Sequence, residues 1–254
     1  MKKFLALALT LTLLLCAAAA TAETLELTAG CNPEWAPFEI MDDNGEIVGF
    51  DADLVAEIAA RTGWKITMIN TNFDSIIGGV QAGTYSMGVS GISINEERLA
   101  SVDFSIPYYD NSMCCVAKVG SAVTDNDSLM GMNIGTQNGT TGVEQAEVMT
   151  DEDKVYTYPS ALNAIMDLQG NKLDAVITDT AVAQAILKEL NDDTLYIVDT
   201  MEFEPDQYAI ELPKNSELKA PIDAAIQSMI DDGTIDKLAV KWGLYGETEE
   251  TAAE

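Results

Sequence analysis

The stretch VSGISINEERLASVDFSIPYY, residues 89–109, places a buried strand directly before a helix. Its first six residues, 89–94, are apolar-rich and β-branched, which is typical of a buried strand. Asn95 is a candidate helix N-cap, and Glu96 and Glu97 would follow in the first turn, where the helix dipole favours acidic side chains. The stretch therefore predicts a strand–loop–helix unit whose helix start offers free backbone N–H groups.

Arg98 departs from this pattern. A cation about one turn inside the positive end of a helix is unfavourable by roughly 0.3–1 kcal/mol. An anion bound at the helix start would explain the residue, because a guanidinium holds a carboxylate or phosphate through two hydrogen bonds. The alternative is an exposed arginine paired with Glu96 or Glu97. Arg98 is therefore a candidate anion-binding residue.

The residues before this stretch alternate strands with helices. We predict a strand over 24–30, a helix capped by Asp51 and ended by Gly63, a strand over 64–70, a helix capped by Asp74 and ended by Gly83, and a strand over 87–93. This order predicts a parallel, doubly wound sheet, in which ligands bind at the carboxyl ends of the strands. The segments 31–35 and 90–93 lie at such ends.

A second α/β unit follows. We predict a strand over 133–136, a glycine-rich loop over 139–142, a helix over 143–149, a helix capped by Ser160, a strand over 173–178 and a helix over 180–190. The loop combines Gly with hydroxyl groups at a helix start, which makes it a second candidate anion site. Asp179 lies at a strand's carboxyl end, where an acid can receive a cation; capping of the next helix is the alternative.

The charge and the residue types exclude several classes of function. The chain carries 13 Lys and Arg against 42 Asp and Glu, a formal net charge of −29, and no His. A field of this sign repels nucleic acid, so we expect no nucleic-acid partner. The absence of His removes Ser-His-Asp and Cys-His nucleophiles as well as His metal sites. Any catalysis would have to use carboxylates, Lys, Tyr or Cys, and we expect no catalytic residue, no metal and no cofactor.

Residues 1–22 have the pattern of an export signal. A basic start precedes an apolar run over 4–15, and ATA at 20–22 fits a cleavage site. We expect cleavage after Ala22 and an exported protein, in the periplasm or at the cell surface. Lipidation of Cys16 is the alternative.

Three cysteines and an acidic tail remain after such cleavage. Cys31 could form a disulfide with Cys114 or Cys115, or all three could be buried, inert thiols. The tail, about 246–254, is acidic and rich in small residues, and we expect it to be disordered.

Seven segments in this order resemble the bacterial extracellular solute-binding proteins of family 3, which bind polar amino acids and feed ABC importers. They are WAPFE at 35–39, GFDADLVAEIA at 49–59, GISINEER at 91–98, VDFSIPYY at 102–109, GTTG at 139–142, LDAVITD at 173–179 and DDGTIDKLAVKWG at 231–243. No single segment is decisive, but the ordered set covers nearly the whole mature chain.

The resemblance implies a type II periplasmic-binding-protein fold. In this fold two α/β lobes, each with a doubly wound, mostly parallel sheet and helices on both faces, are joined by two hinge strands, and the ligand lies in the cleft. Lobe 1 would comprise 23–112 and 209–254, and lobe 2 would comprise 113–208. The crossovers would lie within 113–118 and 201–208.

The resemblance also implies a set of ligand-binding residues, one group for each part of an amino acid. They are Arg98, Ser93, Thr140 and Thr141 for the α-carboxylate, the Gly91 backbone and Asp179 for the α-ammonium, and Trp35, Phe73 and Asn32 around the side chain. Two positions depart from the family pattern: position 32 is Asn where binders of basic amino acids often have Asp, and position 91 is Gly where several relatives have Ser. We therefore expect a polar or small ligand, cystine-like amino acids included, rather than an aromatic one.

The sequence is compatible with three functions. The first is a monomeric binding protein that closes on a free amino acid and passes it to the membrane permease subunits of an ABC importer. The second is a cleft enzyme of the same fold, a dehydratase of cyclic carboxylic acids, which would not need Asp179. The third is an extracellular sensor module. The presence of Asp179 and the absence of His favour the binding protein.

Overall fold

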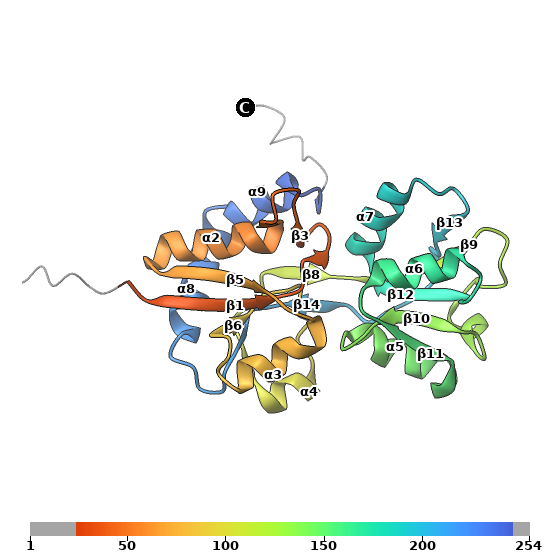
Figure 1. The fold of residues 1–254 in the computed structure, drawn as a ribbon, viewed down its shortest axis with the longest axis horizontal. Helices are drawn as coiled ribbons and strands as arrows, with labels where there is room; N and C mark the ends of the chain where they lie inside the picture. Colours follow the sequence, from red (N-terminus) through yellow and green to blue (C-terminus); the bar gives the residue numbers. More distant parts are fainter. Residues whose placement is uncertain (1–23, 246–254) are drawn as a thin grey trace, which may run out of the picture.

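The computed structural model describes residues 24–245, which form two α/β lobes side by side (Figure 1). Each lobe is built on a five-stranded mixed sheet. The expected fold class, two α/β lobes joined by paired strands, is confirmed. The predicted export signal and the predicted acidic tail lie outside the described residues.

The sheet of lobe 1 has the strand order β5-β1-β6-β15-β7. Its strands are β1 (Glu26–Cys31), β5 (Lys65–Asn70), β6 (Met87–Gly88), β7 (Asp103–Phe104) and β15 (Glu211–Leu212). The first three are mutually parallel, and β15 runs antiparallel to both of its neighbours. Helices α2 (Phe50–Thr62), α8 (Lys219–Asp231) and α9 (Thr234–Lys241) cover one face, and α3 (Ile76–Gln81) and α4 (Glu96–Ser101) lie on the other (Figure 1).

The sheet of lobe 2 has the order β11-β10-β12-β9-β13. Its strands are β9 (Met113–Lys118), β10 (Ile134–Gln137), β11 (Val155–Tyr158), β12 (Ala175–Asp179) and β13 (Leu195–Ile197). Strands β10, β11 and β12 are parallel, and β9 is antiparallel to β12 and β13. Helix α5 (Thr141–Met149) covers one face, and α6 (Ala161–Gln169) and α7 (Thr180–Leu190) cover the other (Figure 1).

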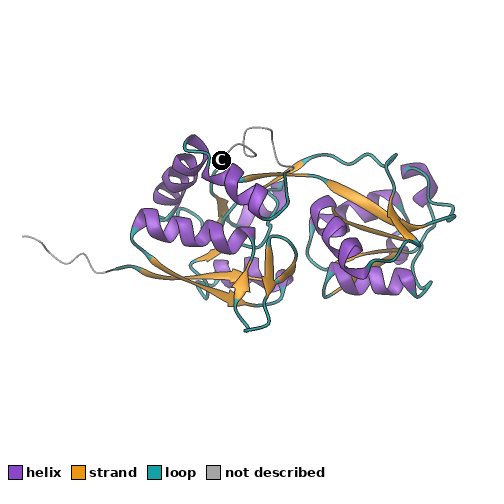
Figure 2. Ribbon diagram, turned by 90° about the horizontal axis from the view of Figure 1, so that it is seen from above, coloured by secondary structure: helices purple, strands orange, loops and turns teal. Residues whose placement is uncertain are grey.

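Two short strands connect the lobes. β8 (Tyr109–Asn111) and β14 (Asp206–Tyr208) pair antiparallel where the chain passes between the lobes, which Figure 2 shows from above. A small sheet of β2 (Glu34–Trp35), β3 (Glu39–Met41) and β4 (Ile47–Val48) lies beside α2. Short 3-10 turns cover Phe73–Ser75, Asn126–Leu129 and Glu152–Lys154.

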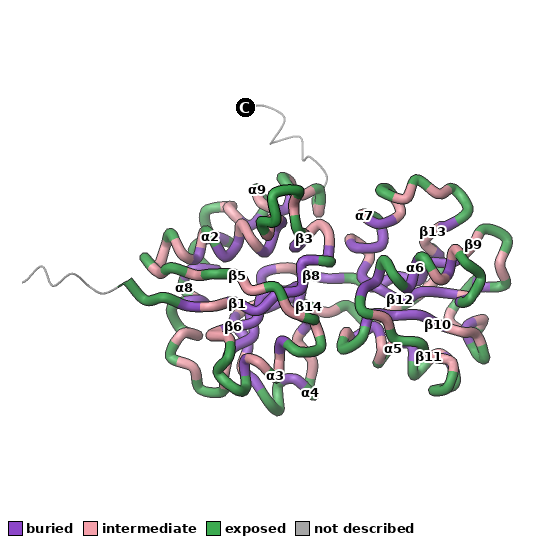
Figure 3. Tube along the Cα trace, viewed as in Figure 1, coloured by how far each residue is buried: buried purple, intermediate pink, exposed green. Residues whose placement is uncertain are grey.

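The buried residues follow the central strands of both sheets (Figure 3). In lobe 1 an aromatic group, in which rings meet mostly edge to face, packs beside the crossover: Phe38, Phe50, Tyr108, Tyr109 and Tyr208. Such a group buries a large apolar area, and edge-to-face contacts add to its stability. Within residues 24–245 no helix is long and apolar enough to cross a membrane.

The predicted strand over 87–93 is only partly correct. The sheet takes up only Met87 and Gly88, and the chain then turns away, with a single bridge from Ser93 to Tyr208. Gly91 has a φ of +53°, which breaks the extended conformation and favours glycine. The segment is buried, as its composition predicts, but beyond Gly88 it is not a strand of the sheet.

Two of the predicted helix caps are wrong. The helix near Asp51 begins at Phe50 after Gly49, and the Asp51 carboxylate instead accepts hydrogen bonds from other segments. Asp74 lies inside a 3-10 turn and does not cap α3. In contrast, the predicted caps Asn95 and Ser160 are confirmed, since each side chain accepts from a backbone N–H of its helix.

The cysteines Cys31, Cys114 and Cys115 are buried free thiols. This is one of the two alternatives that the sequence left open. Burial raises the pKa of all three thiols, and that of Cys115 to about 12, so they are unreactive at neutral pH.

Candidate functional site

Arg98 lies in the first turn of α4, beside the cleft between the lobes. The Asn95 side chain accepts a hydrogen bond from the Arg98 backbone N–H at 2.8 Å. The guanidinium donates to the carbonyl of Ser93 at 2.6 Å and, across the cleft, to the carbonyl of Gly139 at 2.9 Å. Arg98 is only 9% exposed, and its Cζ lies 5.6 Å from the centre of the Phe73 ring. The alternative of an exposed arginine paired with a neighbouring acid is therefore wrong.

The guanidinium of Arg98 keeps hydrogen-bonding capacity. A guanidinium has five N–H donors in one plane, and the two carbonyl contacts leave three of them. Burial lowers the pKa of Arg98, and nearby carboxylates, Glu211 first among them, act in the opposite direction. Because an arginine of this kind stays protonated, Arg98 is a buried cation with free donors. A carboxylate, which accepts two parallel N–H bonds, suits such a group.

The glycine-rich loop of lobe 2 faces Arg98. Gly139 has a φ of +77°, and a Cβ there would lie 3.1 Å from Asp74 of lobe 1, so the close approach of the lobes favours glycine. Thr140 occupies the N-cap position of α5, and the buried Thr141 is its first residue. The start of this helix therefore presents backbone N–H groups toward the cleft.

Asp179 lies at the carboxyl end of β12 and is 4% exposed. It occupies the N-cap position of α7, but its side chain makes no capping hydrogen bond, so the capping alternative is wrong. Instead the carboxylate accepts a hydrogen bond from the hydroxyl of Tyr208. Burial raises the pKa of Asp179 to about 7, against the opposing effects of Tyr208 and Asn111. A buried acid of this kind is stabilised in its charged form when a cation reaches it.

The sequence reasoning missed Tyr208. This ring is fully buried at the end of β14, and its hydroxyl accepts from Trp35 Nε1 at 3.2 Å and donates to Asp179. Gly91 lies against both rings, because a Cβ there would come within 2.8 Å of Trp35 and 3.0 Å of Tyr208. This packing explains why position 91 cannot carry a serine without a shift. A tyrosine in an apolar strand is typical of a core residue, and only its place at the crossover could have marked it.

Asn32 of lobe 1 and Gln137 of lobe 2 form a hydrogen bond between the lobes. Asn32 Nδ2 donates to the carbonyl of Thr71 at 3.2 Å, which fixes the orientation of the amide. Its Oδ1 accepts from Gln137 Nε2 at 3.0 Å. Gln137 is 1% exposed, and within the described residues its Oε1 is buried without a partner. Within the described residues this uncharged amide pair therefore keeps one buried acceptor without a hydrogen bond.

Residues 27–245 match the family model of bacterial extracellular solute-binding proteins, family 3. This chain belongs to that family. "ABC transporter arginine-binding protein 1" of Escherichia coli is 33% identical over 220 residues, which cover 85% of this chain and 90% of the relative.

The solved structures that match include two amino-acid-binding proteins. One is the arginine-, lysine-, histidine-binding protein ArtJ of Geobacillus stearothermophilus, with a TM-score of 0.82, 34% identity and coverage of 90% of this chain and 100% of the other. The second is an ancestral arginine-binding protein bound to glutamine, with a TM-score of 0.81, 35% identity and coverage of 87% and 98%. The chain is therefore an amino-acid-binding component of an ABC transporter and not an enzyme.

In this family 3 protein two buried carboxyl groups bind the segment that follows β6. Glu39 and Asp51 are both fully buried. Ser90 Oγ donates to Glu39 at 2.6 Å, and the Gly91 N–H donates to Asp51 at 2.8 Å, as does the hydroxyl of Tyr108 at 3.0 Å. Burial raises the pKa of Asp51 to about 6 and that of Glu39 well above its usual range. The pair therefore fixes residues 90–91, close in sequence to Ser93, whose carbonyl accepts from Arg98.

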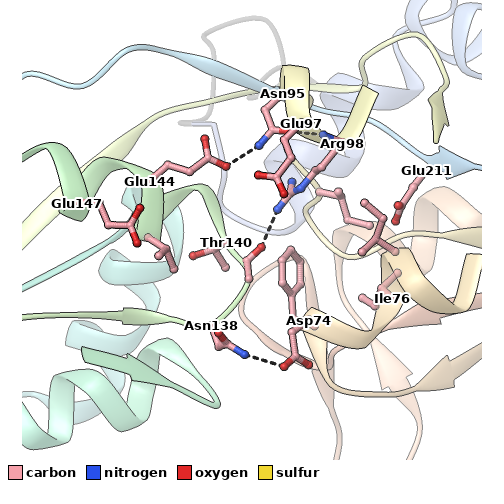
Figure 4. A pocket seen from close by; sticks show the side chains of 15 residues that line it. Asp74, Ile76, Asn95, Glu97, Arg98, Asn138, Thr140, Glu144, Glu147 and Glu211 are labelled. Atoms are coloured by element: carbon pink, nitrogen blue, oxygen red, sulfur yellow. Dashed lines mark hydrogen bonds between the residues drawn. The ribbon is translucent and has the colours of Figure 1, made fainter. Parts of the chain in front are cut away.

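The lobes of this solute-binding protein touch across the cleft. Asn138 Nδ2 donates to Asp74 at 2.6 Å, and Asn95 Nδ2 donates to Glu144 at 2.6 Å. Beside these contacts lies a pocket of about 420 Å³ (Figure 4). Glu144 and Glu147 of α5 border one side of the pocket, and residues of lobe 1 border the other. The structure therefore represents the lobes in contact.

Proposed function

We propose that this protein binds a free L-amino acid in the cleft between its lobes and delivers it to the permease of an ABC importer. The observation that supports this most directly is the pair of opposite, buried charges, Arg98 of α4 and Asp179 of β12, on facing lobes. An amino acid carries the complementary pair of charges about three bonds apart. A ligand that joins both lobes favours the closed state over the open one.

The α-carboxylate would bind to Arg98, with Ser93 and the helix start at Thr140 and Thr141 beside it. The α-ammonium would bind to Asp179, where it replaces part of the lost hydration of that carboxylate. The carbonyl of Gly91 would be a further acceptor, since its N–H already donates to Asp51. These roles are supported by the burial of the groups and by their contacts across the cleft.

The side chain of the ligand would lie toward Trp35, Phe73 and the amide pair Asn32–Gln137. The free acceptor of Gln137 requires an N–H or O–H donor, and the absence of a carboxylate at position 32 removes the counter-charge that favours a cation. Arginine and glutamine both carry such donors. We therefore propose a polar ligand of this kind, with no large preference for a charged side chain over a neutral amide.

A panel of the twenty L-amino acids tests this function. We expect arginine and glutamine to raise the melting temperature of the purified protein, because a ligand at a hundredfold excess over its dissociation constant stabilises the folded state by about 2.7 kcal/mol. Trp fluorescence should change in parallel, since the indole of Trp35 donates to Tyr208, which in turn donates to Asp179. If no amino acid raises the melting temperature, while a cyclic carboxylic acid is consumed, the enzyme alternative replaces this proposal.

The processing of the chain belongs to the same proposal. We expect export, cleavage after Ala22 and a soluble monomer in the periplasm or at the cell surface. Mass spectrometry of the exported protein should give an N-terminus at Glu23. A diacylated or triacylated Cys16 would instead place the protein on a membrane. The proposed lobe boundaries, 112/113 and 208/209, fall beside the paired strands β8 and β14, which supports these strands as the hinge. Residues 113–118, which we expected to hold one crossover, form β9 in the sheet of lobe 2 instead.

A further inference from the structure

Glu211 is a buried carboxyl group without a hydrogen bond to any described residue. It lies on β15 and is 1% exposed, and its Oε1 is buried without a partner. Neither β6 nor α3, which pack against β15, carries a titratable side chain, and Asp103 of β7 is paired with Lys214 at 3.0 Å. A buried carboxyl group that lacks donors costs free energy, so its position needs an explanation.

Arg98 supplies a positive charge that acts on Glu211. Glu211 and Arg98 border the same pocket from lobe 1 (Figure 4), although no ion pair within 4.0 Å joins them. Burial raises the pKa of Glu211 to about 7, and attraction to Arg98 opposes that rise. Conversely, among the carboxylates that raise the pKa of Arg98 and so favour its charged form, Glu211 has the largest effect. The two groups therefore interact through the protein interior, where screening by solvent is weak.

The remaining carboxylates of the pocket differ from Glu211. Asp74, Glu97, Glu144 and Glu147 are exposed to solvent. Asp74 and Glu144 also accept hydrogen bonds from amides of the opposite lobe. Solvent and hydrogen bonds screen these charges. Only Glu211, among the acids that border this pocket, is buried.

We infer that Glu211 is a resident counter-anion of Arg98 that competes with the carboxylate of the ligand and thereby sets the affinity for amino acids. The inference rests on the proposed role of Arg98 in binding that carboxylate. Binding brings a second anion to a guanidinium that Glu211 already faces, and like charges in a buried site disfavour each other. Glu211 thus weakens the complex while it is ionised and ceases to do so once it is protonated.

Glu211→Gln tests this inference, because it keeps the shape and removes the charge. At pH 8 we expect L-arginine and L-glutamine to bind the variant about tenfold more tightly than the parent, the equivalent of one pKa unit. The ratio of the two affinities should fall toward one between pH 8 and pH 5.5, as Glu211 of the parent takes up a proton. Titration of Asp179 is common to both proteins and cancels in this ratio. Calorimetric titrations across this range measure it.

Glu97→Gln is the matched control, because it removes one charge from the same pocket at an exposed position. It should leave affinity within about twofold of the parent, since exposed charges are screened. An equal gain in both variants, or a Glu211→Gln ratio that does not change with pH, would overturn the inference. If the Glu211→Gln variant does not fold, the same titrations are made with Glu211→Ala.

A ligand-free measurement separates this inference from the proposed function. In urea unfolding at pH 8, Arg98→Met should destabilise the parent more than it destabilises Glu211→Gln, because only the parent is left with an unpaired buried anion. If the two destabilisations differ in this way but no amino acid binds the parent, the proposed function alone is overturned. Equal destabilisation in both backgrounds would overturn the counter-anion inference alone.

Discussion

Replacement of Arg98 by Ala should abolish most of the affinity for amino acids. The change would leave the ligand carboxylate buried without a partner, and the loss of one partner of a buried charged pair costs roughly 2–5 kcal/mol. At the upper end this is a loss of more than a thousandfold. The variant also loses the contact to Gly139, so closure of the lobes should be weakened as well. Calorimetric titration with L-arginine and L-glutamine measures the loss.

Two further variants test whether the loss of affinity is due to the guanidinium of Arg98 itself. Arg98→Lys should recover only part of the affinity, because an ammonium cannot form the paired hydrogen bonds of a guanidinium. Arg61→Ala removes an arginine of the same lobe that binds Asp232 and Ser228 at the far end of α2, so it should leave affinity unchanged. Full affinity in a folded Arg98→Ala variant would show that the carboxylate binds elsewhere.

Much of the fold could be predicted because it depends on local patterns. The alternation of apolar strands with helices that carry an apolar stripe predicts both sheets, and side chains such as Asn95 mark helix starts within one turn. Arg98 and Asp179 could also be selected as candidates from the sequence, Arg98 because a cation is unfavourable at a helix start and Asp179 because it ends a strand, although each also had a structural alternative. Their burial on facing lobes agrees with that selection.

The features that could not be predicted depend on contacts between distant segments. Tyr208 and Trp35 are 173 positions apart, and nothing near either residue indicates that they share a hydrogen bond. Asp51 has the local pattern of a helix cap, but the N–H of Gly91 and the hydroxyl of Tyr108 bind its carboxylate instead. The strand after residue 88 ends early because of the packing of Gly91 against two rings. In each case tertiary contacts override a local preference.

Asp179→Asn is expected to be the second most damaging change in the cleft. It keeps the shape and the acceptor for Tyr208 but removes the charge that would hold the ligand ammonium. At pH 8 we expect binding of L-amino acids to weaken by about 1.5–3 kcal/mol, the scale of a charge-assisted hydrogen bond. The preference for an amino acid over its des-amino analogue should shrink with it. Calorimetric titration of both proteins with both ligands measures this.

The pH dependence of the Asp179→Asn effect has a definite sign. Because the folded-state pKa of Asp179 is raised to about 7, the carboxyl group is increasingly protonated below pH 7 and must release a proton to bind an ammonium. The difference in affinity between parent and variant should therefore be largest at pH 8 and shrink toward pH 5. An effect that stayed constant over this range would mean that the lost charge is not the cause.

The ionised carboxyl group of Asp179, which favours binding, should lower the stability of the ligand-free protein. A carboxyl group with a raised folded-state pKa contributes stability that is fully present below its unfolded value near 3.8 and is lost as the pH rises through about 7. At pH 8 the parent keeps a buried anion that the Asn variant lacks, so the variant should melt no lower than the parent. Asp193→Asn, an exposed change in the same lobe, controls for the general loss of charge. If Asp179→Asn lowered the melting temperature of the free protein and left affinity intact, Asp179 would be a structural residue, and the ammonium site would lie elsewhere in the cleft.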